Sequence, residues 1–159
     1  MRESRVWAYL DGHLPVDVQV ERIEVKLPVG LADCFWHAVV PGVSGWLELK
    51  YCEAGDREFR AGRIPKLRPE QPLWLNRKAR AGIPSGILLR VGEDAGWMLW
   101  IASGRPEWAN GVRSAMAVAM ADRVWSGRTG PVPFQFRQVF ESLLEWRSGW
   151  RKGVGYEST

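Results

Sequence analysis

The sequence predicts an α/β domain built on a mixed central β-sheet flanked by helices. Apolar segments of strand length come in two pairs, at 33–40 with 46–52 and at 83–91 with 97–101, and each pair is joined by a turn containing glycine. Segments with helical spacing precede, separate and follow the pairs. The 159 residues suit one domain of ordinary size, and a hydrophobic fraction of 46% is enough to bury a core.

The first segments differ in how clearly they can be assigned. Residues 2–11 are expected to form a helix, because Tyr9 and Leu10 lie on one apolar side. Residues 16–27 are ambiguous: their valines alternate with polar residues as in a strand, whereas Val20 and Ile23 have a helical spacing. We interpret this segment as extended or mixed.

The connection between the two strand pairs is predicted to contain a charged loop over 53–62, a short edge strand over 64–67 and a helix. The helix is expected to begin near Pro69 and Glu70, because proline is tolerated in a first turn and an acidic residue favours the positive helix end. It is expected to end before Gly82.

The last third of the sequence favours helices. Residues 112–125 are rich in Ala and Met, 127–133 resemble a Gly/Pro linker, and 134–147 form an amphipathic helix. Its apolar stripe consists of Phe136, Val139, Phe140, Leu143 and Leu144. We therefore divide the chain into a core domain, 1–104, and a C-terminal helical extension, 105–159, packed on the core or in a dimer interface.

Two cysteines without a Cys-x-x-Cys motif argue against a disulfide scaffold or structural zinc. Cys34 and Cys52 are expected on opposite faces, which fits a reducing cytoplasmic setting. No run is apolar enough for a membrane span, and the first residues lack the apolar core of a signal peptide. Most of the ten tryptophans are expected to be core residues or interface anchors.

Three ionisable residues are expected to converge on the first strand pair. Glu48 and Lys50 point to one strand face, roughly 6–7 Å apart along the strand, while the leucines beside them point to the other. If Asp33 pairs across from this region, two carboxylates and an ammonium share one patch. Two carboxylates at ~4 Å repel by roughly 4 kcal/mol at an effective dielectric of 20, so such a pair tends to lose one charge by protonation, to separate or to bind a cation. A divalent metal beside a lysine suits phosphodiester hydrolysis.

Glu48-Leu49-Lys50 alone also fits a solvent-exposed strand face with a surface ion pair. Glu24-Val25-Lys26 has the same pattern elsewhere in the chain. His37 lies on the Asp33 face, where it is either a polar neighbour or a further ligand. The position of Asp33 after Gly30 and before the Pro/Gly turn favours the first strand pair as the site.

Four segments together resemble a known superfamily. They are GLADCFW at 30–36, GWLELKY at 45–51, LRPEQPLWL at 67–75 and AGIPSGILLRV at 81–91. Over about 22–101, the chain resembles the PD-(D/E)xK nucleases, and among these the small phage Holliday-junction-resolvase-like and virus-type replication-repair nucleases. The resemblance implies a restriction-endonuclease-like core. Ala32 stands where this superfamily usually has proline.

The resemblance implies a metal site that binds Mg²⁺ or Mn²⁺. Asp33 and Glu48 would be ligands, the Leu49 carbonyl would complete the shell, and Glu24 would be the upstream acidic residue, with Glu21 as the alternative. Lys50, as implied by the same resemblance, would orient the attacking water or stabilise the developing charge. Hard oxygen donors favour these ions over Zn²⁺.

Basic residues follow the proposed site closely. Residues 56–80 hold eight basic and three acidic side chains in a chain of net charge +4. The basic residues Arg77, Lys78 and Arg80 lie on the expected helix and cannot all face one way. The glutamine of this helix resembles the one that starts the helix behind the site in the superfamily. The residues expected to contact DNA are Arg60, Arg63, Lys66, Arg68 and Gln71.

The leading hypothesis is a metal-dependent DNA endonuclease of phage type that cuts branched or recombination intermediates. Symmetric nicking of two strands would imply a homodimer. One alternative is a DNA-binding descendant of the nuclease fold that has no activity. Another is a protein-interaction module, such as a phage inhibitor of a host factor, that uses tryptophans as anchors.

Overall fold

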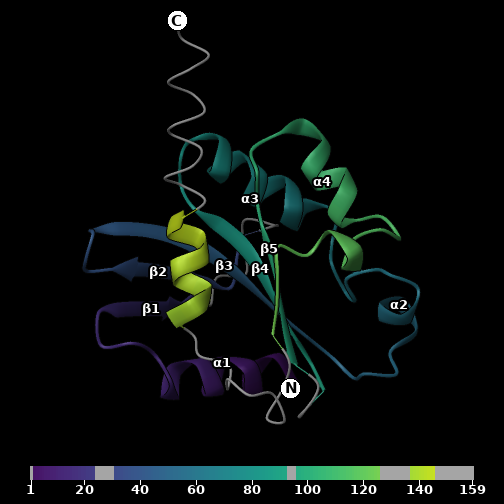
Figure 1. Ribbon diagram of the computed structural model, residues 1–159, viewed down its shortest axis with the longest axis horizontal. Helices are drawn as coiled ribbons and strands as arrows, with labels where there is room; N and C mark the ends of the chain where they lie inside the picture. Colours follow the sequence, from purple (N-terminus) through teal and green to yellow (C-terminus); the bar gives the residue numbers. More distant parts are fainter. Residues whose placement is uncertain (1, 24–30, 93–95, 126–136, 146–159) are drawn as a thin grey trace, which may run out of the picture.

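The computed structural model describes residues 2–23, 31–92, 96–125 and 137–145 (Figure 1). Six strands form one sheet in the order β1-β2-β3-β4-β5-β6, in which β3 and β4 are parallel and all other neighbours antiparallel. The strands are β1 (Val18–Arg22), β2 (Cys34–Ala38), β3 (Val43–Cys52), β4 (Ser85–Val91), β5 (Gly96–Ile101) and β6 (Arg123–Trp125). The predicted α/β class with a mixed sheet is confirmed.

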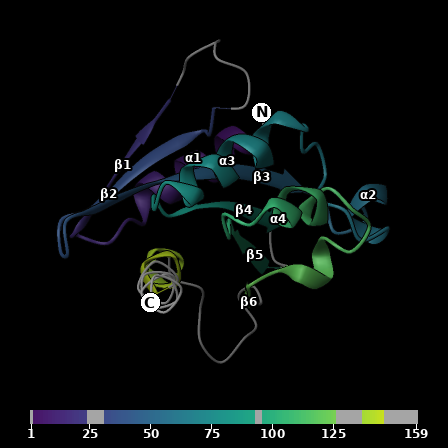
Figure 2. The ribbon, with the colours of Figure 1, turned by 90° about the horizontal axis from the view of Figure 1, so that it is seen from above.

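The parallel pair β3–β4 requires a long connection, because the chain must return to the same end of the sheet. The connection contains α2 (Arg57–Arg60) and α3 (Glu70–Arg80), and α3 begins and ends where the sequence predicts. The predicted edge strand over 64–67 is wrong. Lys66 has a positive φ of 59°, which is incompatible with an extended strand. Figure 2 shows α2 at the opposite end of the molecule from β1 and β2.

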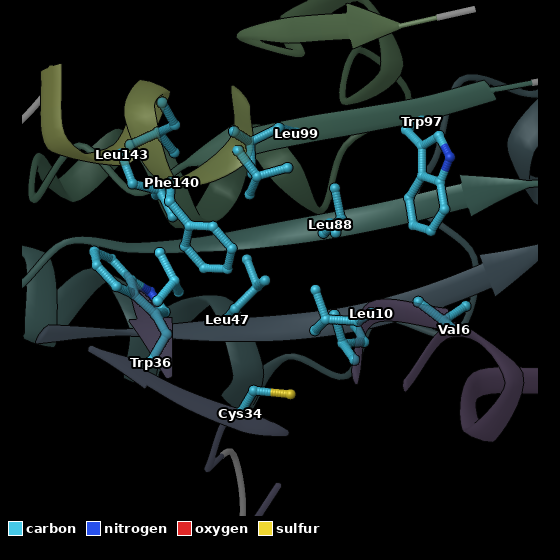
Figure 3. Packing of buried hydrophobic residues seen from close by; sticks show 14 of the residues in the cluster. Val6, Leu10, Cys34, Trp36, Leu47, Leu88, Trp97, Leu99, Phe140 and Leu143 are labelled. Atoms are coloured by element: carbon cyan, nitrogen blue, oxygen red, sulfur yellow. The ribbon is translucent and has the colours of Figure 1, made fainter. Parts of the chain in front are cut away.

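One face of the sheet, called here the α1 face, is covered by α1 (Arg2–Gly12) and by the C-terminal helix, residues 137–145. Leu47 of β3 packs in the same cluster as Leu10, Phe140 and Leu143, all fully or almost fully buried (Figure 3). The predicted first helix is therefore confirmed. The apolar stripe predicted for the last helix packs on the sheet wherever it is described, but Phe136 and the 127–133 linker lie outside the described residues.

The opposite face, called here the α3 face, is covered by α3 and α4 (Pro106–Val112). Leu75 of α3 and Trp108 of α4 share a cluster with Ile87 of β4. The expectation of tryptophans in the core is met at Trp36, Trp74, Trp97, Trp100 and Trp108, each at most 9% exposed.

The helix predicted over 112–125 is wrong. Only the end of α4, a 3₁₀ turn η1 (Val118–Met120) and β6 occupy that range. Beside short local turns, this backbone bonds to the core: the Trp100 Nε1 donates to the Ala117 carbonyl at 2.6 Å, and the Asp122 N–H donates to the Leu99 carbonyl at 2.8 Å. These tertiary hydrogen bonds outweigh the helix propensity of alanine and methionine.

The ambiguous segment 16–27 contains strand β1, and its residues from 24 onward lie outside the described residues. Elements from both sides of residue 104 share the sheet and its two cores. Among the described helices, none has the length and apolar character needed to span a bilayer.

Candidate metal and catalytic site

Strand register brings Asp33 and Glu48 together. Cys34 pairs with Leu47 in the antiparallel ladder of β2 and β3, so Asp33, just before β2, lies opposite Glu48. Directly opposed residues in an antiparallel pair project to the same face. Lys50, two residues further along β3, projects to that face as well. The two carboxylates and the ammonium thus meet on the α3 face, while Cys34 packs on the α1 face.

Asp33 is tied to the backbone of β3. Its Oδ2 accepts a hydrogen bond from the Leu49 N–H at 2.9 Å, and its carbonyl accepts one from the Ile23 N–H at 2.8 Å. In an extended strand the N–H and C=O of one residue point to the same side. The Leu49 carbonyl therefore points toward Asp33, just past the end of β2.

Glu48 is the most enclosed acidic side chain of the cluster, with 1% of its surface exposed. Its Oε1 accepts hydrogen bonds from the Lys50 Nζ at 3.0 Å and from the Gln71 Nε2 at 2.6 Å. Its Oε2 is buried and has no hydrogen-bond partner among the residues that the structure describes. A buried carboxylate oxygen without a partner is costly, and it is available to a cation.

Burial raises the pKa of Glu48 to about 8; the Lys50 ammonium opposes this shift, and the neighbouring Asp33 carboxylate adds to it. At neutral pH without a bound cation, a large share of Glu48 therefore carries a proton. A cation close to Oε2 would favour the ionised form, which couples ion binding to proton release.

The donors present fit a hard divalent ion, because carboxylate and carbonyl oxygens are the ligands that Mg²⁺ and Mn²⁺ prefer. Within the described part of the chain, no group of three His, Cys, Asp or Glu side chains is arranged for a metal. The predicted third acid, Glu24, lies outside the described residues. The alternative, Glu21, is exposed on β1 opposite Phe35, one strand further from Glu48.

Gln71 links the start of α3 to the site. Its Nε2 donates to Glu48, and its Oε1 accepts from the Arg68 N–H at 2.9 Å. Both polar atoms of the amide are thus engaged within the chain, which positions Glu48. The sequence predicts Gln71 among the DNA contacts, and only the resemblance to a superfamily suggests its place behind the site.

The other residues predicted to contact DNA lie on the connection between β3 and α3. All four are exposed: Arg60 ends α2, and the others follow in the loop that leads to Gln71. They are Arg60, Arg63, Lys66 and Arg68. No ion pair joins any of these four to an acidic side chain in the described parts of the chain.

His37 stands apart from the carboxylates. It pairs with Ser44 near the turn between β2 and β3, and its Nδ1 lies 2.7 Å from the Ser44 Oγ. This hydrogen bond accounts for its polar side chain, and the structure does not bring it to Asp33 or Glu48.

No protein-family model matches the sequence, and no curated protein sequence matches it. The structure is similar to that of Hjc, a Holliday junction resolvase from the archaeal hyperthermophile Archaeoglobus fulgidus. The similarity has a TM-score of 0.42 with 15% sequence identity and covers 63% of this chain and 74% of that chain. The mixed sheet with α3 packed behind β3 is itself consistent with the predicted restriction-endonuclease-like core.

Proposed function

We propose that the chain is a DNA endonuclease that hydrolyses phosphodiester bonds with Mg²⁺ or Mn²⁺. The observation that carries this proposal is the environment of Glu48. One oxygen of this buried carboxylate is held by Lys50 and Gln71. The other oxygen has no hydrogen-bond partner among the described residues, and the Asp33 carboxylate lies close to it. Such an arrangement leaves one oriented donor atom for an ion.

Asp33, Glu48 and the Leu49 carbonyl would hold the ion, with Glu24 as a further ligand. Bound there, the ion supplies Lewis-acid polarisation of the phosphate and lowers the pKa of a bound water. Lys50 is 5% exposed and keeps its ammonium beside Glu48. A compact positive charge at this place stabilises negative charge that develops on the scissile phosphate and orients the attacking water.

The substrate we propose is branched DNA, as in recombination intermediates, and the enzyme would be of phage type and act in the host cytoplasm. Resolution of a four-way junction requires two symmetric nicks, which a homodimer supplies. The exposed basic connection at 60–68 would contact phosphates.

The test is a cleavage assay on four-way junction, flap, single-stranded and duplex DNA, each with Mg²⁺, Mn²⁺ or EDTA. The proposal expects cleavage with either ion, none in EDTA, and the fastest cleavage on the junction. Failure to cut any of the four with either ion would refute the nuclease assignment. Cleavage of plain duplex alone would refute the assignment of branched DNA as the substrate but not the nuclease assignment.

A second candidate is a DNA-binding module without activity. The favouring observation is that two of the carboxylate oxygens are already bonded without an ion: Leu49 satisfies Asp33 Oδ2, and Lys50 and Gln71 satisfy Glu48 Oε1. Calorimetry separates the two candidates. Absence of Mg²⁺ and Mn²⁺ binding at millimolar concentration, together with DNA binding in EDTA, would favour this module.

A further inference from the structure

A groove of about 410 Å³ lies between α3 and α4 and is distinct from the carboxylate cluster. Its lining contains two arginines and no acidic side chain. The lining residues are Leu73, Asn76, Arg77, Arg80, Pro106 and Ala109. Sequence analysis expected that the basic residues of this helix cannot all face one way. Arg77 and Arg80 line the groove, whereas Lys78 lies over the Trp74 ring, with its Nζ 5.0 Å from the ring centroid.

Within the described residues, no acidic side chain forms an ion pair with the two arginines of the groove. The side chain of Arg77 is exposed and makes no ion pair or hydrogen bond with any part of the chain that the structure describes. Arg80 donates its Nε to the Gly104 carbonyl at 3.3 Å, which leaves most donors of its guanidinium free. The two guanidinium groups thus offer unpaired donors to an anion along one side of α3.

The rest of the lining is apolar or already bonded. Leu73 is 50% exposed and, with the apolar residues of α4, forms an uncharged wall. Asn76 is buried, and both atoms of its amide are engaged, with the Gly104 N–H and the Arg105 carbonyl, each at 2.8 Å. Asn76 therefore builds the groove and does not offer its amide to a ligand.

We propose that the α3–α4 groove binds a sugar–phosphate backbone of DNA outside the cleavage site. Arginine forks match phosphate oxygens, and the apolar wall suits the sugar, so the charge and the lining both complement this ligand. The inference rests on the proposed function, because that function makes DNA the partner. Arg77 lies six residues after Gln71, about 9 Å along the helix axis at 1.5 Å per residue. Because Gln71 and Arg77 lie on the same helix, α3 would hold the DNA backbone at a fixed distance from Glu48.

The test compares two double variants that each remove two exposed positive charges. Arg77→Ala/Arg80→Ala changes the groove. Arg123→Ala/Arg137→Ala is the control, because those side chains are 50% and 55% exposed in surface ion pairs elsewhere. Affinity for a labelled four-way junction is measured by fluorescence anisotropy in EDTA over a salt series. Thermal unfolding establishes that each variant is folded, and Arg77→Ala alone avoids any effect on the Arg80–Gly104 contact.

The groove variant should bind the junction about tenfold or more weakly than the wild type. The slope of log affinity against log salt concentration should become shallower by about two, while the affinity of the control stays within about twofold of the wild type. A groove variant with wild-type affinity, or an equal loss in the control, overturns the inference. If the inference is overturned in either way but the wild type still cleaves DNA, the nuclease proposal stands. Groove-dependent binding without cleavage would support the groove and refute the nuclease, and a wild type that binds no DNA would refute both.

Discussion

The carboxylate of Asp33 accepts a hydrogen bond from the backbone N–H of Leu49 at 2.9 Å. Strand β2 begins one residue later, at Cys34, so the Asp33 side chain takes the place of a strand partner for β3. The bond holds one carboxylate oxygen on the strand that carries Glu48. Two acids from neighbouring strands are thereby kept together although their charges repel.

Removal of the Gln71 amide should destabilise the site. Gln71→Ala deletes the donor to Glu48 and the acceptor for the Arg68 N–H. We expect the free energy of unfolding in urea to fall by about 1–3 kcal/mol, because buried polar atoms lose their partners. The control Arg77→Ala, on the same helix but exposed and unpaired, should change it by less than about 0.5 kcal/mol. Equal effects of the two substitutions would contradict the positioning role of Gln71.

Ionisation of Glu48 should destabilise the metal-free protein. Burial raises the pKa of Glu48 in the folded state to about 8 from its ordinary value of 4.5, so between these pH values the folded state holds a proton that the unfolded state has lost. The free energy of unfolding should therefore fall with rising pH in this window, relative to Glu48→Gln, by up to about 1.4 kcal/mol per pH unit. Urea titrations of both proteins at several pH values measure the difference. A difference that stays constant or moves the other way would contradict the buried, proton-retaining Glu48.

Binding of a divalent ion should release protons. The ion requires the ionised form of Glu48, which burial disfavours, so affinity should fall as the pH is lowered from about 8 to 6. Calorimetric titration with Mn²⁺ in two buffers of different ionisation enthalpy measures the proton release, and Asp33→Asn should weaken or abolish the binding. Ion binding without proton release would indicate that the ion does not contact Glu48.

The C-terminal helix should be an essential part of the core. Leu143 is fully buried against the α1 face, so Leu143→Ala should lower the free energy of unfolding by about 2–5 kcal/mol. Val16→Ala is the matched control, because Val16 is fully exposed and should cost less than about 0.5 kcal/mol. A Leu143→Ala variant as stable as the control would show that the helix does not pack on the sheet in solution.

Local signals were sufficient for parts of the fold. Helix α3 could be predicted because proline, glutamate and glycine mark its ends within the segment itself. Segment 112–125 could not, because its backbone partners, such as the Trp100 indole, come from strands far away in sequence. The sequence places Gly45 in the turn, whereas it lies within β3, where a Cβ atom would clash with the Pro84 carbonyl oxygen. Such close approach depends on the sheet as a whole.

Local sequence signals also predicted only part of the candidate site. Strand alternation was sufficient to place Glu48 and Lys50 on one face, and the turn between the strands placed Asp33 across from them. The partner-free Glu48 Oε2 and the double hydrogen bond of Gln71 follow from how α3 packs on the sheet, which no local pattern encodes. The roles of these residues in catalysis stay predictions.

The central claim is that Asp33, Glu48 and Lys50 act together in metal-dependent cleavage. The most direct measurement is the initial rate of four-way-junction cleavage in Mn²⁺ for the wild type, Asp33→Asn, Glu48→Gln and Lys50→Ala, with His37→Ala as a folded control. The account predicts a loss of at least about a hundredfold in each of the three variants and little change in the control. Cleavage at wild-type rates by all three purified variants would contradict it.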